Sequence, residues 1–255
     1  MKHPWAITVS LVILFLAAQL LGLSIINKYL QYSEEGVSWE KIPSLGGVEI
    51  ERPDLTPSQT IFYIVGAILI GSLLIFLLIR FRSVLLWKLW FALAIILCLY
   101  IAFAAFFMPK IAFVIALILG IGKVFFPNRY LHNLSELFIY GGLAALFTPL
   151  LTVQTAFLLL LILAIYDFYA VFKSKHMIAL AQFQTKSKVC AGLLKSYKGK
   201  VSAKKETGTL AVLGGGDIGF PLLFSGTVLA ASGSLAAVIV ALGATLGLLV
   251  LLLIG

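Results

Sequence analysis

The segment LGGGDIGF, residues 213–220, combines four glycines and Asp217 inside an apolar run that extends from residue 209 to 232. A charged Asp in the middle of a membrane-spanning helix costs roughly 2.5–3.5 kcal/mol, so an acid in such a position is a candidate functional residue. Each glycine weakens a helix by about 1 kcal/mol relative to Ala, and Pro221 lacks the N–H that would continue the helix. We expect the loosened helix to leave room beside Asp217 for water and for a second backbone.

The composition is that of an integral membrane protein. Of the 255 residues, 62% are hydrophobic and only 11% are charged, and the mean hydropathy is +1.10. Soluble domains are about 45–50% apolar and about 25% charged. The lipid bilayer is therefore the expected surroundings of the chain. The net charge of +9 does not by itself indicate binding to nucleic acid. Nine lysines lie together between Lys173 and Lys205, and membrane proteins carry such clusters in their cytoplasmic loops.

Eight apolar runs are long enough to be read as membrane spans, for which about 20 residues are needed. They cover residues 5–26, 60–79, 89–107, 111–126, 134–150, 153–172, 209–232 and 234–254. We predict an all-α, polytopic transmembrane helical bundle, with residues 1–255 as a single membrane-embedded domain. Spans 1–6 occupy about 5–172, a basic cytoplasmic loop about 173–208, and spans 7–8 about 209–254.

The distribution of Lys and Arg predicts the orientation. With the amino terminus in the cytoplasm, fifteen of these residues fall on the cytoplasmic side and four on the outer side. Cytoplasmic loops carry such an excess, and the basic loop at 173–208 would lie near anionic lipid head groups. The loop at 27–59, with six of the ten acids, is expected to be a solvated outer loop.

Two acids, Asp167 and Asp217, remain within apolar runs. On consecutive antiparallel helices they would lie roughly 8 and 12 Å below the same membrane surface, and so we expect the carboxylates to face each other. Two carboxylates in a site of low dielectric constant do not both ionise readily. One of them can accept a proton from water while its protonated partner polarises a carbonyl.

The other polar residues have simpler interpretations. Glu136 is expected in the first turn of the fifth span, where the helix dipole favours an acid. His3, His132 and His176 show no ligand spacing, and neither a metal nor an organic cofactor is expected. Gly214, Gly216 and Gly219 match the pattern GxGxxG, but the strand and βαβ unit of a dinucleotide site are absent from the pattern around them.

The sequence leaves two alternatives to a catalytic pair. Asp167 and Asp217 could simply hold two helices together, although interhelical polar contacts average only about 0.6 kcal/mol. They could instead bind a proton or cation in an ion-coupled transporter or channel. A transporter predicts an internal repeat, and the glycine-interrupted segment at residues 119–123 carries a lysine and no acid.

Tyr166-Asp167 in the sixth span and Gly214-Gly215-Gly216-Asp217 in the seventh resemble the YD and GxGD motifs of the presenilin and signal-peptide-peptidase family of intramembrane aspartyl proteases. The orientation resembles that of the presenilin branch, and the compact chain looks most like a microbial presenilin homologue. The resemblance implies hydrolysis of peptide bonds in transmembrane segments, with Asp167 and Asp217 as the catalytic pair. Residues lining the site would be Tyr166, Leu213, Gly214, Gly215 and Gly216.

The resemblance also implies a ninth span that carries a Pro-Ala-Leu motif. This sequence contains no Pro-Ala-Leu, so that element is either not represented in the sequence or absent. A substrate helix must unwind before water can attack it, and its freed backbone needs partners within the membrane. Residues 209–213 could supply them as a strand, or could form the first turns of the seventh span.

Overall fold

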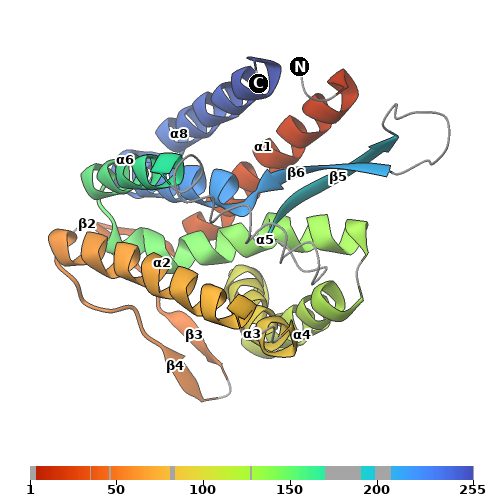
Figure 1. Cartoon of the computed structure of the whole chain (residues 1–255). Helices are drawn as coiled ribbons and strands as arrows, with labels where there is room; N and C mark the ends of the chain where they lie inside the picture. The colour runs from red at the N-terminus through yellow and green to blue at the C-terminus, as the bar shows by residue number, and fades with distance from the viewer. Residues whose placement is uncertain are drawn as a thin grey trace.

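The chain is described here by a computed structural model of residues 4–34, 36–45, 47–80, 84–126, 128–169, 191–198 and 208–254. Helices follow the apolar runs (Figure 1). They are α1 (Trp5–Lys28), α2 (Pro57–Arg80), α3 (Val84–Ala104), α4 (Pro109–Phe125), α5 (Arg129–Phe147), the 3-10 turn η1 (Thr148–Leu150), α6 (Val153–Tyr169) and α8 (Gly215–Ile254). Two predicted runs share α8, which breaks at Gly233, where φ is 84° and ψ is 177°.

Among the described residues, fewer than eight helices are long and apolar enough to cross a membrane. Within the described ranges, α1, α3 and α8 qualify individually. The segment Arg129–Leu150 and α6 qualify together but are bent by 119° relative to each other. The eight-span count therefore stays a prediction.

The expectation of an all-α chain is wrong in one respect, because the described residues include three two-stranded antiparallel hairpins besides the helices. The segment 27–59, which was expected to be an outer loop, contains β1 (Leu30–Ser33), β2 (Gly36–Trp39), β3 (Ile42–Leu45) and β4 (Val48–Ile50). The third hairpin pairs β5 (Gly192–Lys198) with β6 (Gly208–Gly214). Part of the expected basic loop is therefore a strand, and residues 173–190 and 199–207 lie outside the described residues.

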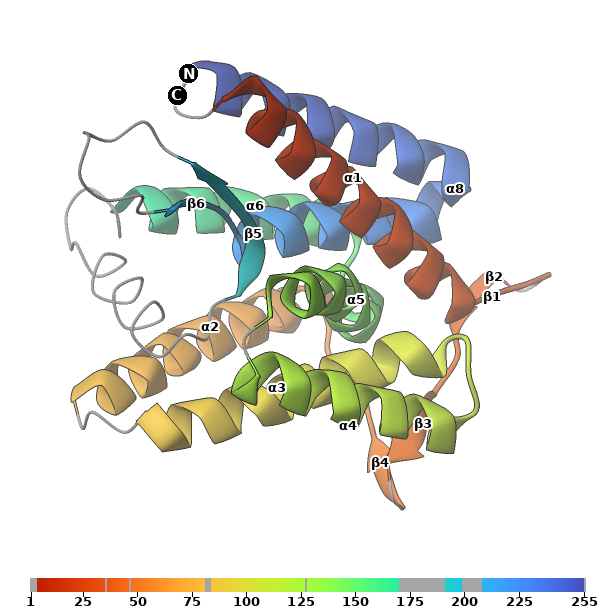
Figure 2. The same ribbon diagram turned by 90° about the vertical axis from the view of Figure 1, so that its right-hand side faces the viewer.

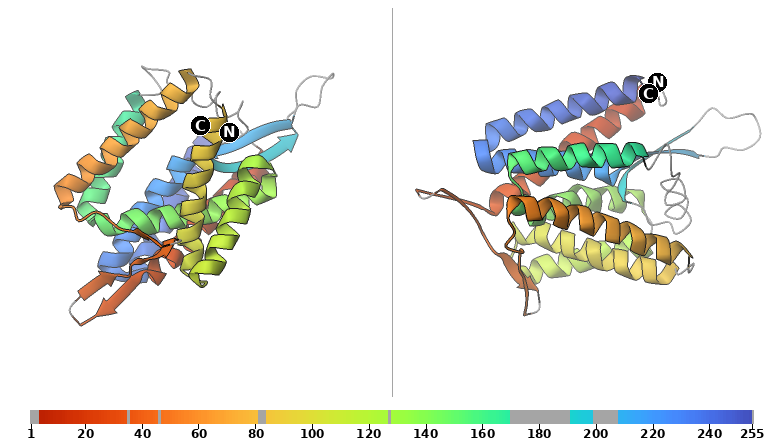
Figure 3. Two further views of the ribbon diagram at one scale, coloured as in Figure 1. Left: turned by 90° about the horizontal axis from the view of Figure 1, so that it is seen from below. Right: turned by 60° about the vertical axis from the view of Figure 1, so that its left-hand side comes forward.

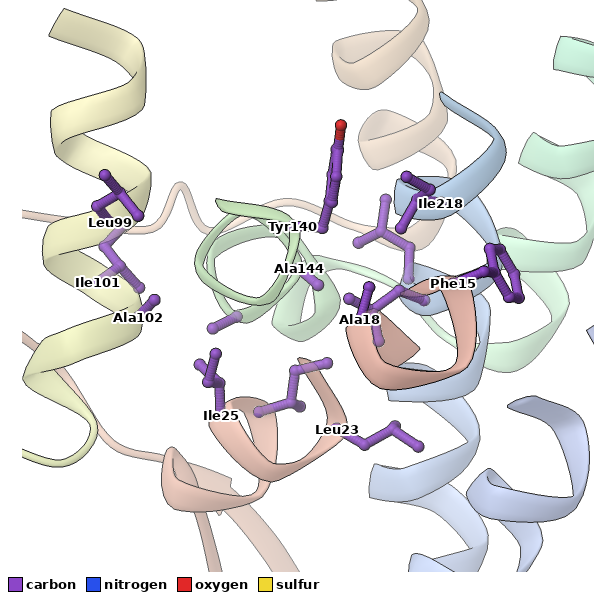
Figure 4. Close-up of a cluster of buried hydrophobic side chains, with 14 of the residues drawn as sticks. Phe15, Ala18, Leu23, Ile25, Leu99, Ile101, Ala102, Tyr140, Ala144 and Ile218 are labelled. Atoms are coloured by element: carbon purple, nitrogen blue, oxygen red, sulfur yellow. The ribbon is translucent and has the colours of Figure 1, made fainter. Parts of the chain in front are cut away.

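Helix α5 lies at the centre of the bundle and contacts α1, α3, α4, α8 and β5 (Figure 2). Its inner side is buried against apolar side chains of α1, α3 and α8, among them Ile25, Leu99 and Ile218 (Figure 4). Glycines allow the closest approaches. A Cβ added at Gly142 would lie 1.9 Å from the carbonyl oxygen of Cys98, so α5 and α3 touch backbone to backbone.

The two ends of the bundle carry different elements. The start of α1 lies at the same end as the β5–β6 hairpin, and β1 to β4 lie at the opposite end (Figure 3). Helix α6 ends and helix α8 begins at the β5–β6 end. The polar motifs of the sixth and seventh predicted spans therefore meet on one side of the molecule.

The replacement Gly142→Ala is expected to destabilise the bundle by at least about 1–3 kcal/mol, because the new methyl group meets backbone atoms that cannot move aside. Thermal unfolding in detergent, followed by tryptophan fluorescence, measures the change. Gly243→Ala is the matched control, since a Cβ at that position in α8 meets nothing within 4 Å. Equal unfolding temperatures for the two variants would contradict the close approach of α5 and α3.

Candidate functional site

Asp217 lies in the first turn of α8 and not in the middle of a helix. The difference from the prediction arises because residues 208–214 form β6, so the helix begins at Gly215 instead of residue 209. The Asp217 carboxyl group lies beside Gly214, because a Cβ built at Gly214 would be 3.1 Å from Oδ2 of Asp217. Asp217 is thus a third-position acid that lies near the residue preceding the helix, which is the placement of the acid in a capping box. The dipole of α8 further favours an acid at this end.

Asp167 lies on α6, two residues before the last described residue of that helix. Helix α6 packs against α8, and the carboxyl groups of Asp167 and Asp217 are close enough to interact electrostatically. The side chains of both acids are exposed, and Tyr166 is half-buried. The structure thus places the two predicted acids on neighbouring helices, with both side chains exposed.

The three consecutive glycines meet different surroundings. A Cβ at Gly214 would lie 3.1 Å from Oδ2 of Asp217, and one at Gly215 would lie 2.7 Å from the hydroxyl of Tyr140. At Gly216 the nearest atom would be in the ring of Phe220, at an ordinary contact distance of 3.4 Å. Gly214 and Gly215 therefore permit close contacts on the two sides of the helix start.

The β5–β6 hairpin has one covered edge and one open edge. In an antiparallel ladder, the N–H and C=O of one residue point to the same side. Those of Leu194 point away from β6, because its N–H donates to Oδ1 of Asn133 at 2.9 Å and its C=O accepts from Nδ2 at 2.8 Å. Leu194 lies opposite Val212, so the backbone groups of Val212 point away from β5. No strand pairs with this edge of β6 among the described residues.

The side chains of β6 alternate between buried and exposed, as expected for a strand with one packed face. Ala211 and Leu213 are buried, and Val212 between them is 54% exposed. Leu213, predicted to line the site, therefore belongs to the packed face of the hairpin. The interpretation of residues 209–213 as a strand is confirmed, and their partner in the structure is β5 of the same chain.

A buried ion pair lies behind the hairpin and was not predicted. Nζ of Lys123 on α4 donates to Oε1 of Glu136, and the hydroxyl of Tyr140 donates to Oε2 of the same carboxylate. Glu136 is 1% exposed and lies beyond the first turn of α5, which begins at Arg129. The expectation of a first-turn acid is therefore wrong. His132 is also buried and not a surface residue, and its Nε2 bonds the carbonyl of Gly192 at 2.8 Å.

At the end of the bundle opposite to Asp167 and Asp217, Arg52 connects the segment 27–59 to α5. Its guanidinium donates to the carbonyl of Glu40 at 2.8 Å and to that of Ala145, near the end of α5, at 3.3 Å. Burial raises the pKa of Tyr29 and lowers the pKa of Arg52, whose guanidinium lies over the Tyr29 ring. Two cavities there are lined in part by Arg52 and Asp54, remote in the fold from Asp167 and Asp217.

Two comparisons with known proteins give matches to this chain. A family model described as signal-peptide peptidase, presenilin aspartyl protease matches residues 45–254. The fold is similar to a solved structure described as a presenilin family intramembrane aspartate protease, with a TM-score of 0.62 and 16% sequence identity. That match covers 97% of this chain and 88% of the other. The comparison with curated proteins found no match.

The replacement Lys123→Met is expected to destabilise the protein by about 3–5 kcal/mol, because it leaves the Glu136 carboxylate buried without its cation. The double variant Lys123→Met/Glu136→Gln removes that charge while keeping an acceptor for Tyr140, so it is expected to recover most of the loss. Thermal unfolding of the parent, both single variants and the double variant completes the cycle. Additive single effects would contradict a direct ion pair.

Proposed function

Because the chain belongs to the signal-peptide peptidase and presenilin family of aspartyl proteases, we propose that it hydrolyses peptide bonds within transmembrane segments of membrane proteins. Asp167 and Asp217 are the proposed catalytic pair. The observation that carries the proposal is their convergence, at the end of α6 and the start of α8, within electrostatic range of each other. Tyr166 and the glycines 214–216 are the proposed lining of the site.

The chemistry requires one proton between the two carboxyl groups. The ionised group accepts a proton from water, whose oxygen attacks the peptide carbonyl carbon, while the protonated partner donates a hydrogen bond to the carbonyl oxygen. Collapse of the tetrahedral intermediate breaks the C–N bond, and a proton passes to the departing amine. The products are a carboxylic acid and an amine, and none of these steps calls for a redox cofactor.

The open edge of β6 is the proposed binding site for the unwound part of the substrate. An extended peptide added there would receive backbone hydrogen bonds, which an unwound segment needs in a membrane. The strand continues directly into Gly214 and the first turn of α8, which carries Asp217. A substrate aligned along β6 is therefore led to the carboxyl groups.

For the orientation, we propose that the amino terminus and the segment 173–208 face the cytoplasm. The start of α1 and the β5–β6 hairpin share one end of the bundle, and the charge distribution of the sequence favours that end as the cytoplasmic one. The ion- or proton-coupled transporter raised as an alternative receives no support from the family match.

Cleavage of a reporter transmembrane peptide by the purified protein in lipid vesicles tests the proposal. Asp167→Ala and Asp217→Ala are each expected to lower the rate by at least about 10²-fold, since each removes one proton-transferring group. Asp54→Ala, which removes an exposed acid at the other end of the bundle, is the matched control and is expected to cleave like the parent. Full cleavage by either of the first two variants, or a folded parent that cleaves no reporter, would count against the proposal.

Val212→Pro tests the binding edge. Proline removes the N–H that points away from β5, and strands tolerate proline at such edges, so the hairpin is expected to remain. One lost backbone hydrogen bond corresponds to roughly a 2- to 12-fold loss in kcat/KM. Val212→Ala keeps the amide and is expected to retain the parental value. If both variants lose the same activity, the amide of residue 212 does not bind substrate.

A further inference from the structure

One face of α5 holds the two elements that flank the proposed active site. His132, Asn133, Glu136 and Tyr140 lie along this face at helical spacing. We name these four residues the α5 polar face. His132 and Asn133 bond the backbone of β5, while Tyr140 lies against Gly215 at the start of α8. A single rigid helix therefore contacts both the hairpin and the turn that carries Asp217.

Asn133 binds β5 as a neighbouring strand would. Its side-chain amide accepts from the N–H of Leu194 and donates to the C=O of the same residue, at 2.9 and 2.8 Å. His132 Nε2 bonds the carbonyl of Gly192, two residues earlier on the same edge. A slip of the strand by one residue would turn these backbone groups to the opposite side, so the contacts specify the position of β5 along α5.

The rest of the polar face fixes the start of α8. The hydroxyl of Tyr140 bonds Glu136, which is held in turn by Lys123 of α4. The same hydroxyl would lie 2.7 Å from a Cβ at Gly215, so only a glycine fits at this distance without a shift. The first turn of α8 thus packs directly on a tyrosine whose position is set by a buried ion pair.

We propose that the α5 polar face, and Asn133 in particular, determines which peptide bond of the substrate is cleaved. The inference rests on the proposed function, with substrate bound along the open edge of β6. Asn133 fixes β5, the ladder pairs Leu194 with Val212, and β6 aligns the substrate with Asp217. A shift of this hairpin by one residue displaces a bound strand by about 3.3 Å, the length of one residue. Asn133 is in this role a positioning residue, since it touches neither substrate nor the carboxyl groups.

The first test compares the cleavage positions of the parent and of Asn133→Ala by mass spectrometry of the reporter products. Loss of both side-chain bonds is expected to raise the proportion of products displaced by one or two residues roughly tenfold relative to the main product. Asn133→Asp keeps the acceptor for the Leu194 N–H and loses the donor, so a smaller displacement of the same kind is expected. The ratio of products does not depend on the fraction of folded enzyme.

Asn128→Ala is the matched control. Asn128 is the same residue type at the N-cap of the same helix, and its side chain accepts from the N–H of Tyr130 at 2.9 Å. Its replacement weakens α5 without removing a bond to β5, and the parental cleavage positions are expected. Displaced products from Asn128→Ala equal to those from Asn133→Ala would overturn the proposal, because any weakening of α5 would then suffice.

Hydrogen exchange of residues 192–198 supplies a readout that is independent of activity. Exchange in this segment is expected to be faster in Asn133→Ala than in both Asn128→Ala and the parent. Unchanged exchange would overturn the anchoring of β5 by Asn133, and this result can be read even from a protein that cleaves no peptide. A parent protein that cleaves no peptide would separately refute the proposed protease function. Faster exchange with unchanged products in an active enzyme would overturn the control of cleavage position and leave the protease function standing.

Discussion

Backbone amides and carbonyls cannot be left without partners in a membrane, and this constraint shapes the region around Asp217. The chain enters that region as a strand, and β5 satisfies one edge of β6. The outer edge of β5 is satisfied in turn by side chains of α5, chiefly Asn133. The glycines that follow connect the strand to α8, whose first turn carries Asp217. What is left over, the open edge of β6, is the place where a further strand could be added.

The central helix of the bundle reverses the usual distribution of polar groups. In a soluble protein the charged residues of a helix face water, whereas Glu136 and Lys123 here are turned inward and shielded from the surroundings. Their cost is offset by their mutual attraction and by the hydroxyl of Tyr140. Large apolar side chains occupy the outside of the neighbouring helices, where lipid would be their solvent.

The sequence predicted much of this architecture, and its failures have physical causes. Helices lie in the apolar runs because a long apolar segment must satisfy its own backbone. The start of α8 was misplaced because residues 209–213 are apolar and continuous with the helix, and periodicity does not separate a short buried strand from a helical turn. The proximity of Asp167 and Asp217 followed from their depths on consecutive helices. The ion pair of Lys123 and Glu136 was not predicted, because the two residues lie on different helices and the sequence pattern around each one does not indicate its partner.

The contact between α1 and α8 has a consequence for the assembly of the chain. Gln19 is fully buried, and its amide donates to the carbonyl of Ile218, 199 positions later. Leu222 likewise packs against Gly22, where no side chain separates them. During synthesis, α1 emerges long before α8, so Gln19 and Gly22 lack these partners until α8 has been made. Because contacts between residues far apart in the sequence form slowly, the packing of α1 against α8 is expected to be a late step of folding.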